Sequence, residues 1–518
     1  MKAIKLILLG LAAVGLFFLP ASSLAAETLI YGTTEKIIDM DPGKAYDFHT
    51  WEIFYNIYEG LMKYKLGETT LEPGLAESYS ISGDGKEYTF KLREGLKFSD
   101  GTAFDANAVK WSIDRVMALQ GDPSWLVTDF VDRVDVVDKY AVKFVLKNPV
   151  AYFPQLVASV PYYPVNPNIY PQDKLIRDPS ELKGGKLVGL GAYQVVSFKR
   201  DQEIVLDTNP NYYGEKPKND RIVIRYFADA TTMRLAIEKG EVDFVFKTLN
   251  PSDIADLEKS AKIQTIKAQG PYIRYICFLT DTPPWDNPKL RQAVAAAVNR
   301  PALINKVFLG QNAPLYSMVP MGMWSHTDTF KEMLGDGNIE KAKQLLKEAG
   351  YSESKPLTFD FWYTPSHYGD TEVDIAAVLK NQLEATGVMK VNVKSAEWAA
   401  YRDNWANKVM PVWLLGWYPD YIDPDNYTSA FAGTAGSKGL GIHFSSEKWD
   451  QKLVEGQTIT DAGKRTEVYK TIQQWWSEDV PTAPLFQGTL YLFSQKNVRG
   501  ITISPTLQFI YAPIHRAK

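Results

Sequence analysis

The sequence predicts a protein of the α/β class with two or three domains, on the basis of three observations. Strand-like and helix-like hydrophobic patterns alternate along the chain, separated by Gly, Pro and Asp. A chain of 518 residues is too long for a single hydrophobic core. No repeat, low-complexity tract or long linker interrupts the patterned segments. We therefore expect α/β domains that pack together with few loose connections.

The N-terminus has the pattern of a secretory signal peptide. Lys2 and Lys5 precede an apolar block at 6–19, and mostly small residues follow up to Ala26. The block is short for the ~20 residues that a membrane-spanning helix needs, so a retained membrane anchor is the weaker alternative. We expect cleavage after Ala25 or Ala26 and a mature protein in the periplasm or at the cell exterior.

The composition excludes several other classes of protein. Cys277 is the sole cysteine and lies far from the cleavage site, which excludes an intramolecular disulfide and a lipid anchor at the usual position. Loss of Lys2 and Lys5 would change the formal charge from −4 to −6, which leaves no basic footprint for nucleic acid. We expect a monomer. The 13 Trp, 29 Tyr and 24 Phe fit either large cores or a cleft lined with rings, and both readings remain open.

Two strands and a helix are predicted in the first part of the mature chain. The stretch 88–92 alternates apolar and polar residues, and 142–146 repeats this period of two. Between them, Asp105 can cap a helix whose apolar residues recur at helical spacing over 109–116. The block 61–187 therefore resembles a small mixed α/β unit.

Four later helices are predicted, at 231–239, 287–300, 372–386 and 460–476. Gly240 directly follows the first of them and is a favoured C-terminal cap. Asn287 and Pro288 place a cap and a first-turn proline at the start of the second. Arg300-Pro301 marks its end, because the residue before a proline avoids helical geometry.

The stretch 414–427 is the most informative one for function. A short apolar run leads into aromatic residues, a proline and Asp420. A strand that delivers a carboxylate and aromatic rings to a loop suits an amphipathic solute with a cationic end, because a buried carboxylate forms a charge-assisted bond with an ammonium group. The alternative for Asp420 is a turn or helix cap, which fits Asp423 and Asp425 better because they flank Pro424.

Several stretches resemble the dipeptide- and oligopeptide-binding proteins of bacterial ABC importers, solute-binding protein family 5, in the order in which that family uses them. The run 88–101, which reads YTFKLREGLKFSDG, is close to the family signature. The other matching stretches are 39–42, 56–61, 71–78, 283–300, 417–426 and 479–485. Together they span nearly the whole mature chain.

The resemblance implies a periplasmic-binding-protein-like fold, in which two lobes are hinged by two crossings and an additional α/β domain is inserted. Three domains are expected in all. Domain I would comprise 27–60, 188–268 and 488–518, domain II the inserted 61–187, and domain III 269–487. The lobes would close over a ligand.

The resemblance also implies a binding site around Asp420, which in this family receives the α-amino group of a peptide. Trp417 and Trp398 match positions of pocket tryptophans, and Tyr418 is a weaker companion. Tyr46 and Trp51 follow a turn that faces the cleft in the family, although helix-face packing is at least as good an explanation for them. Trp405 and His367 are the weakest candidates.

One departure from the family bears on the ligand. Dipeptide binders carry an arginine near residues 366–368 that holds the peptide carboxylate, whereas this chain has Ser366-His367-Tyr368. The resemblance to a dedicated dipeptide receptor is weakened at this point, and longer peptides or other solutes remain open. Two milder departures should not disturb the fold: the stretch 189–193 reads GLGAY where the family usually has GTGPY, and Thr280 stands in place of an asparagine.

Other kinds of site are not supported by the sequence. The spacing of Asp420, Asp423 and Asp425 lacks the glycine and terminal glutamate of a calcium loop. The histidines are scattered without a ligand-spaced pair, so we predict no metal site and no cofactor. No catalytic motif singles out an acid, base or nucleophile, so we expect a binding protein and not an enzyme.

Three kinds of ligand are compatible with these observations. We expect a receptor that captures peptides, most simply oligopeptides, and delivers them to a membrane permease of an ABC transporter. An oligosaccharide receptor of the same family is the alternative, because tryptophan-rich loops can stack on sugar rings. Capture of nickel or a metal complex is less favoured. Replacement of Asp420 separates the first two readings, because only an ammonium ligand would be left with an unpaired charge.

Overall fold

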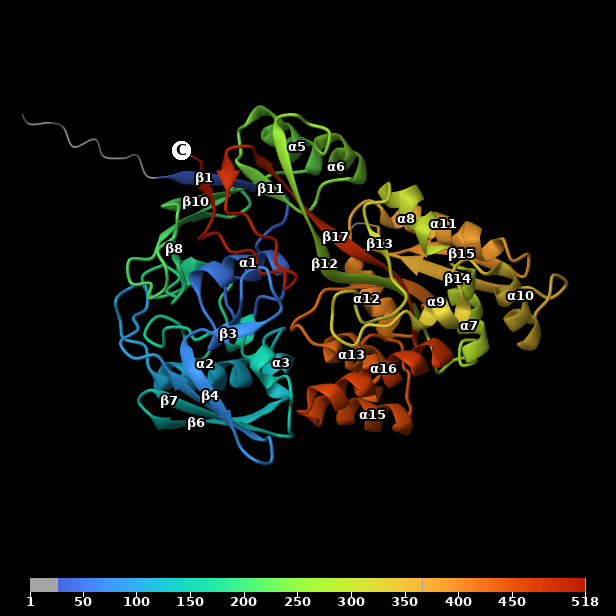
Figure 1. The fold of residues 1–518 in the computed structure, drawn as a ribbon, viewed down its shortest axis with the longest axis horizontal. Coiled ribbons are helices and arrows are strands. Elements are labelled where there is room, and N and C mark those ends of the chain that lie inside the picture. The colour runs from blue at the N-terminus through green and yellow to red at the C-terminus, as the bar shows by residue number, and fades with distance from the viewer. Residues whose placement is uncertain (1–26, 366, 518) are drawn as a thin grey trace, which may run out of the picture.

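The computed structural model describes residues 27–365 and 367–517, so the predicted signal peptide and Ser366 lie outside the described residues. One 11-stranded sheet extends through both halves of the molecule (Figure 1). Its main path runs, from edge to edge, through β15 (Met389–Ser395), β14 (Leu357–Tyr363), β16 (Val412–Trp417), β12 (Ile263–Phe278), β17 (Thr482–Gln495), β11 (Phe244–Phe246), β1 (Thr28–Thr33), β10 (Arg221–Tyr226), β9 (Glu203–Thr208) and β8 (Tyr193–Lys199). The short β13 (Ala313–Pro314) pairs with β17 off this path.

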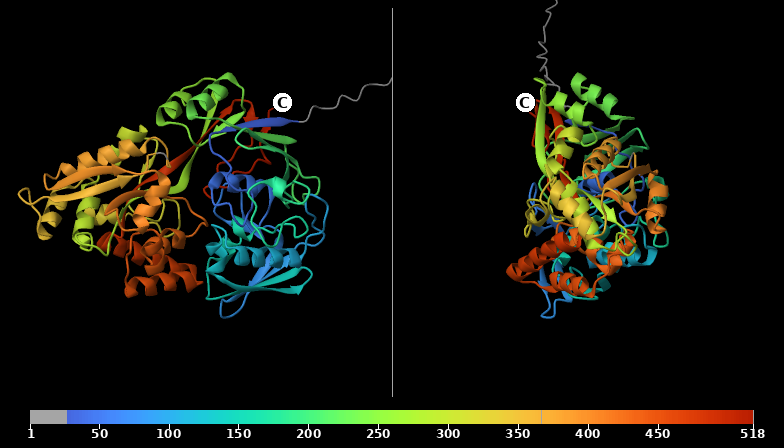
Figure 2. Two further views of the ribbon diagram at one scale, coloured as in Figure 1. Left: turned by 180° about the vertical axis from the view of Figure 1, so that it is seen from behind. Right: turned by 90° about the vertical axis from the view of Figure 1, so that its right-hand side faces the viewer.

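The two longest strands connect the halves. β12 and β17 pair antiparallel from Ile263↔Gln495 to Cys277↔Thr482 and run between the two halves (Figures 1 and 2). Their register shifts between Gln269 and Ile273. In this irregular stretch a Cβ on Gly488 would lie 1.6 Å from the Tyr272 ring, so only glycine leaves room for that ring.

The predicted strands of the block 61–187 are confirmed. β5 (Glu87–Leu92) and β7 (Ala141–Leu146) lie at the centre of a four-stranded antiparallel sheet, with β4 (Ala76–Ile81) and β6 (Val131–Asp138) at its edges. Their apolar residues alternate in burial as the period of two predicts. α2 (Ala106–Leu119) packs on this sheet, and the Asp105 side chain accepts from the Asn107 N–H as predicted for its cap. A two-stranded ribbon of β2 (Met62–Tyr64) and β3 (Leu71–Pro73) precedes it.

The later helices form close to their predicted positions, with one correction. α5 (Ala230–Lys239) ends at Gly240 in the left-handed conformation, and α11 (Glu372–Glu384) and α16 (Ala462–Asp479) overlap the predicted ranges. α7 (Pro288–Ala297) ends before Arg300, and Arg300-Pro301 instead opens α8 (Arg300–Phe308). The reason is that proline is favoured in a first helical turn as well as after a last one, and Asn299 supplies the cap.

The remaining helices are distributed over both halves of the molecule (Figure 1). They are α1 (Phe48–Ile57), α3 (Trp125–Thr128), α4 (Phe153–Leu156), α6 (Pro251–Leu257), α9 (Thr329–Leu334), α10 (Ile339–Glu348), α12 (Trp398–Ala406), α13 (Ser429–Ala432), α14 (Thr434–Gly439) and α15 (Glu447–Thr458). Within residues 27–517 apart from 366, no helix has both the length and the apolar character to cross a membrane. Cys277 is buried in β12 and forms no disulfide.

Candidate ligand-binding site

The loop after β16 holds Asp420 in a buried position. The residue is 6% exposed, its carboxylate lies 3.5 Å from the Asn426 amide nitrogen, and the Tyr46 hydroxyl lies near enough to stabilise the ionised form. Asn426 also fixes the loop, because its oxygen accepts from the Asp420 N–H at 3.1 Å and from the Trp417 indole N–H at 3.0 Å. Burial raises the pKa of Asp420 to about 7. No lysine, arginine or histidine of the described chain pairs with this carboxylate.

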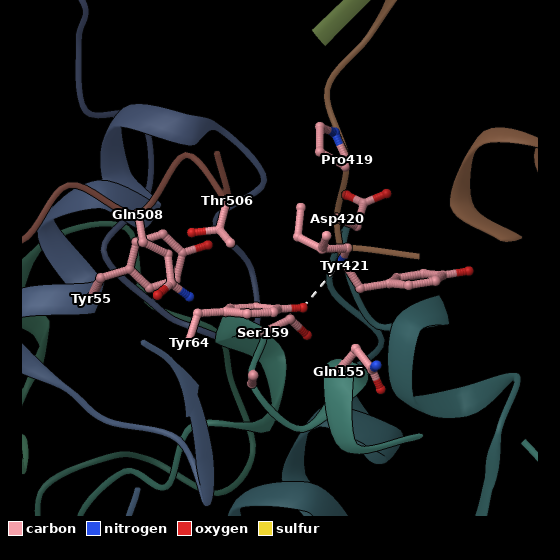
Figure 3. Close-up of a pocket in the computed structure, with 11 residues that line it drawn as sticks. Tyr55, Tyr64, Gln155, Ser159, Pro419, Asp420, Tyr421, Thr506 and Gln508 are labelled. Carbon is pink, nitrogen blue, oxygen red and sulfur yellow. Dashed lines mark hydrogen bonds between the residues drawn. The ribbon is translucent and has the colours of Figure 1, made fainter. Parts of the chain in front are cut away.

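A small cavity adjoins Asp420 at a place where distant segments meet (Figure 3). Asp420 and Tyr421 contribute one side, Tyr55 and Tyr64 face them, and the segment of Gln508 closes the cavity. Its volume is about 10 Å³, which is room for about one water molecule. The carboxylate of Asp420 is therefore enclosed by the lobes rather than open to bulk solvent.

The two acids that follow in the same loop have complete sets of partners. Asp423 caps the 3-10 turn Pro424–Tyr427 and forms two hydrogen bonds of 2.6 Å with the Arg465 guanidinium. Asp425 accepts from the hydroxyls of Tyr152 at 2.7 Å and Tyr421 at 2.9 Å. The capping role predicted for Asp423 is confirmed, and both residues hold the loop in place.

Aromatic rings surround the loop on the side of α1. Tyr418 lies between Phe48, with ring centroids 4.9 Å apart, and Tyr272, whose ring it stacks on at 5.0 Å. Tyr46 is 42% exposed and lies next to Trp51, which is 1% exposed. The Trp51 indole donates to the Ala45 carbonyl at 2.7 Å. Tyr46 thus reaches Asp420 directly, whereas Trp51 supports Tyr46 from within the core.

A second aromatic group contains Trp398, Trp405 and His367. His367 stacks on Trp398 with centroids 3.6 Å apart and planes 3° apart, and burial lowers the pKa of His367 to about 4. Trp405 is buried and packs edge-on against Trp398, with ring centroids 5.5 Å apart. Tyr368 meets Trp398 edge-on at 5.9 Å. Trp417 belongs to neither group and packs edge-on against Phe431 at 5.0 Å.

The sequence analysis missed Arg274, which joins this second group from β12. Its guanidinium lies 3.7 Å above the centre of the Tyr368 ring and pairs with the Glu372 carboxylate. The side chain is 5% exposed. A lone arginine within the apolar run 273–279 is the sequence signal that could have drawn attention to it.

A third group of charges, also unexpected, lies on the α1 side. Oxygen and nitrogen atoms of Glu35, His49 and Glu52 lie within 4.8 Å of one another. The Lys247 ammonium is 3.3 Å from Glu52 and 3.7 Å from Glu35, so a protein cation already balances these acids. Burial lowers the pKa of His49 to about 4 and keeps the ring neutral. This group is accordingly explained as a buried charge network.

Comparisons with known proteins identify the family. Residues 70–439 match the model of the bacterial extracellular solute-binding proteins, family 5, middle region. The chain belongs to this family. It is 29% identical to heme-binding protein A of Haemophilus influenzae, over 94% of this chain and 91% of that protein. It is 28% identical to the dipeptide-binding protein of Escherichia coli, over 94% of each chain. The family is one of extracellular solute-binding proteins.

Solved structures confirm the predicted fold class. The DppA periplasmic binding protein of Helicobacter pylori, in complex with the peptide STSA, matches with a TM-score of 0.78 at 24% identity, over 95% of this chain and 98% of that chain. The dipeptide-binding protein of a Pseudoalteromonas species, in complex with Met-Leu, matches with a TM-score of 0.80 at 23% identity, over 95% and 100%. The chain therefore has the two-lobed, three-domain fold, with β12 and β17 as the strands that cross between the lobes. The domain boundaries given above stay a prediction.

Proposed function

We propose that this protein is the extracytoplasmic receptor of an ABC importer that captures peptides and passes them to a membrane permease. In this proposal the chain is exported by its N-terminal signal peptide, works in the periplasm as a monomer and carries no lipid anchor. Several relatives support the peptide class: besides the Escherichia coli protein, a di/tripeptide-binding protein of Pseudomonas aeruginosa is 26% identical over 90% of each chain.

The observation that carries the proposal is the carboxylate of Asp420. It is buried at the meeting point of the lobes, its loop is held by Asn426, and no cation of the described chain balances it. A ligand ammonium group would supply the missing positive charge and would meet acceptors at a fixed position. Tyr46, which precedes α1, and Tyr418, whose ring contacts Phe48 of α1, would line the path to it.

The oligosaccharide alternative receives less support from the aromatic side chains. Stacking on sugar rings needs open faces of tryptophan rings. One face of Trp398 is covered by His367 at 3.6 Å, and Trp405 and Trp51 are buried in cores. Trp417 is held by its hydrogen bond to Asn426 and its contact with Phe431. A metal-complex receptor is not favoured either, since the one cluster of suitable side chains among the described residues already contains Lys247.

Native mass spectrometry of the gently purified mature protein tests the proposal. We expect a ladder of added masses that tandem fragmentation resolves into short peptides, because closed lobes release their ligand slowly. Hexose-spaced masses would overturn the proposal in favour of the sugar receptor, and the mass of a porphyrin would assign the chain to the heme-binding type of relative. A protein that is purified empty is titrated with peptides and oligosaccharides in melting scans, where stabilisation by sugars alone would contradict the proposal.

A further inference from the structure

A direct contact between the two lobes lies close to the candidate site but outside it. Tyr152 belongs to the hydrophobic core of one lobe, and Asp425 lies two residues before Tyr427, which belongs to the core of the other. The Tyr152 hydroxyl donates a hydrogen bond of 2.7 Å to the Asp425 carboxylate, and both residues are buried. Neither of them lines the cavity beside Asp420. The protein therefore makes this contact by itself, without a ligand to bridge it.

Three further interactions surround the Tyr152 ring and its neighbour in the chain. The ring stacks on Tyr421 with centroids 5.0 Å apart and planes 5° apart. The Arg465 guanidinium lies over the Tyr152 ring at 5.4 Å from its centre. The Ala151 N–H donates to the Gln457 carbonyl of α15 at 2.8 Å. All three interactions join the block 61–187 to the opposite lobe, so they form and break together with the hydrogen bond from Tyr152.

The loop after β16 also enters the core of the opposite lobe. Among the described residues 247–489, Tyr421 and Ile422 are the two buried residues that pack in the core formed by 29–246 and 490–514. The Ile422 N–H donates to the Tyr64 hydroxyl of β2 at 3.2 Å (Figure 3). Separation of the lobes would return this apolar surface to water, so its burial favours the closed arrangement.

The Asp425 carboxylate can lose its partner in the opposite lobe without becoming a stranded charge. It also accepts hydrogen bonds from Tyr421 at 2.9 Å, Ser429 at 2.5 Å and Tyr469 at 3.3 Å, which come from its own loop and from α13 and α16. Water would take the place of Tyr152 when the lobes separate. The contact is thus built to be reversible, because its opening leaves no buried charge without partners.

We propose that Tyr152 and Asp425 form a latch that closes the two lobes of this protein in the absence of a ligand. Opening, with β12 and β17 as the hinge, breaks the hydrogen bond from Tyr152 and withdraws Tyr421 and Ile422 from the opposite core. The ligand-free receptor is then mostly closed, and a solute enters through the open minority. The inference goes beyond the proposed function, because the latch sets the balance of open and closed protein whatever the solute is.

Pulsed electron paramagnetic resonance on the ligand-free protein measures the two populations. Spin labels are attached at Ser80→Cys on β4 and Val454→Cys on α15, two exposed positions on the two halves of the molecule (Figure 1). The native Cys277 is buried and does not compete for the label. Dialysis in mild denaturant removes any solute that co-purifies, and native mass spectrometry checks that the protein is empty. We expect the shorter distance of the closed state to predominate.

Two variants that each remove a single hydroxyl separate the latch from general effects on folding. Tyr152→Phe keeps the ring that stacks on Tyr421 and loses the hydrogen bond to Asp425. The ratio of open to closed protein should rise about 10- to 100-fold, the scale of one hydrogen bond to a charged group. The matched control is Tyr162→Phe, which removes a buried hydroxyl that donates to the Leu126 carbonyl at 2.8 Å within the same block. This variant should leave the ratio unchanged.

The measurements can overturn the latch in three ways. One is a labelled, ligand-free protein that shows only the open distance, a result that needs neither tyrosine variant. Another is a ratio of open to closed protein that does not change in Tyr152→Phe, and the third is an equal rise in Tyr162→Phe. A failure of peptides to bind would contradict the proposed function and leave the latch standing, because no ligand is present in these measurements.

Discussion

Two parts of one loop differ in how their charges are balanced. Asp423 forms two 2.6 Å hydrogen bonds with Arg465, and that guanidinium has a partner at every nitrogen. Three residues earlier, Asp420 is just as buried, yet only an amide, a hydroxyl and its own backbone stabilise its charge. On the neighbouring strand, Arg274 retains two unpaired donors. The Asp423–Arg465 pair is therefore complete within the protein. Asp420 lacks a basic partner, and Arg274 lacks protein acceptors for two of its nitrogens.

We interpret this difference as one between groups that hold the fold and groups that would meet a ligand in the proposed function. A buried ion pair with full hydrogen bonding gives a fixed geometry, and loss of one partner leaves a stranded charge. Asp420 carries such a stranded charge whenever it is ionised, which is why its pKa is raised to about 7. The four experiments below test this distinction.

The largest expected effect is on stability, from the complete pair. Asp423→Ala should lower the free energy of unfolding by about 3–5 kcal/mol, because it strands the Arg465 guanidinium in a buried position. Urea denaturation followed by tryptophan fluorescence measures this change. The matched comparison is Asp420→Asn, which should cause no such loss. Equal destabilisation by both variants would contradict the difference between a paired Asp423 and an unpaired Asp420.

The next effect is on ligand affinity, from the unbalanced carboxylate. Asp420→Asn should weaken peptide binding by about 2–5 kcal/mol, since the ligand ammonium would be buried without its partner charge. Titration calorimetry with a peptide found by mass spectrometry measures this loss. A loss below about 1.5 kcal/mol, the scale of one neutral hydrogen bond, would instead support a hydroxyl ligand.

A pH series should show a smaller, graded effect at the same residue. Because the folded pKa of Asp420 is about 7, an ammonium ligand must displace a proton below that pH, and affinity should fall by up to tenfold per pH unit from 7 to 5. The ligand-free protein should show the opposite trend. The folded state keeps a proton that the unfolded state loses near pH 4, so its stability should decrease as pH rises from about 4 to 7.

Asp420→Asn provides the control for the pH series. The pH dependence of binding should be absent in this variant, because the amide does not titrate. Its stability should decrease less than that of the unaltered protein as pH rises from about 4 to 7, and the buried Asp47, whose pKa is raised to about 6, should account for part of the remaining decrease. Measurements in buffers of different ionisation enthalpy should show proton release on binding by the unaltered protein below pH 7. Affinity that does not change between pH 5 and 7 would contradict an ionised Asp420 as the partner of the ligand.

The smallest effect is expected from the stacked pair of rings. His367→Ala should change peptide affinity by about 0.5–1.5 kcal/mol, the scale of one aromatic contact, because it uncovers one face of Trp398. The effect should not depend on pH above 5, since the pKa of His367 is lowered to about 4 and the ring is neutral. A gain in binding of oligosaccharides by this variant would show that the covered face of Trp398 is what excludes sugars.

The sequence by itself determined the local elements and the family. The strands at 88–92 and 142–146, the cap at Asp105 and the helix end at Gly240 all follow from residue types within a few positions of one another. The capping role of Asp423 follows from its place before Pro424. The stretches that resemble the family are also short and contiguous. They could therefore be recognised in the sequence, and they identified the fold class. The end of α7 was misplaced, since proline stops one helix and starts another equally well.

Only the tertiary structure decided which charges are balanced. The segment 366–368 lacks the arginine expected of a dipeptide binder, yet Tyr368 lies beneath Arg274, which comes from a strand about 90 residues earlier. Arg465 meets Asp423 across 42 residues, and no basic residue of the described chain meets Asp420 in this way. Such contacts depend on strand register and on how the lobes close, which local periodicity does not encode. The sequence thus located the loop, and the packing determined which of its carboxylates has a basic partner within the protein.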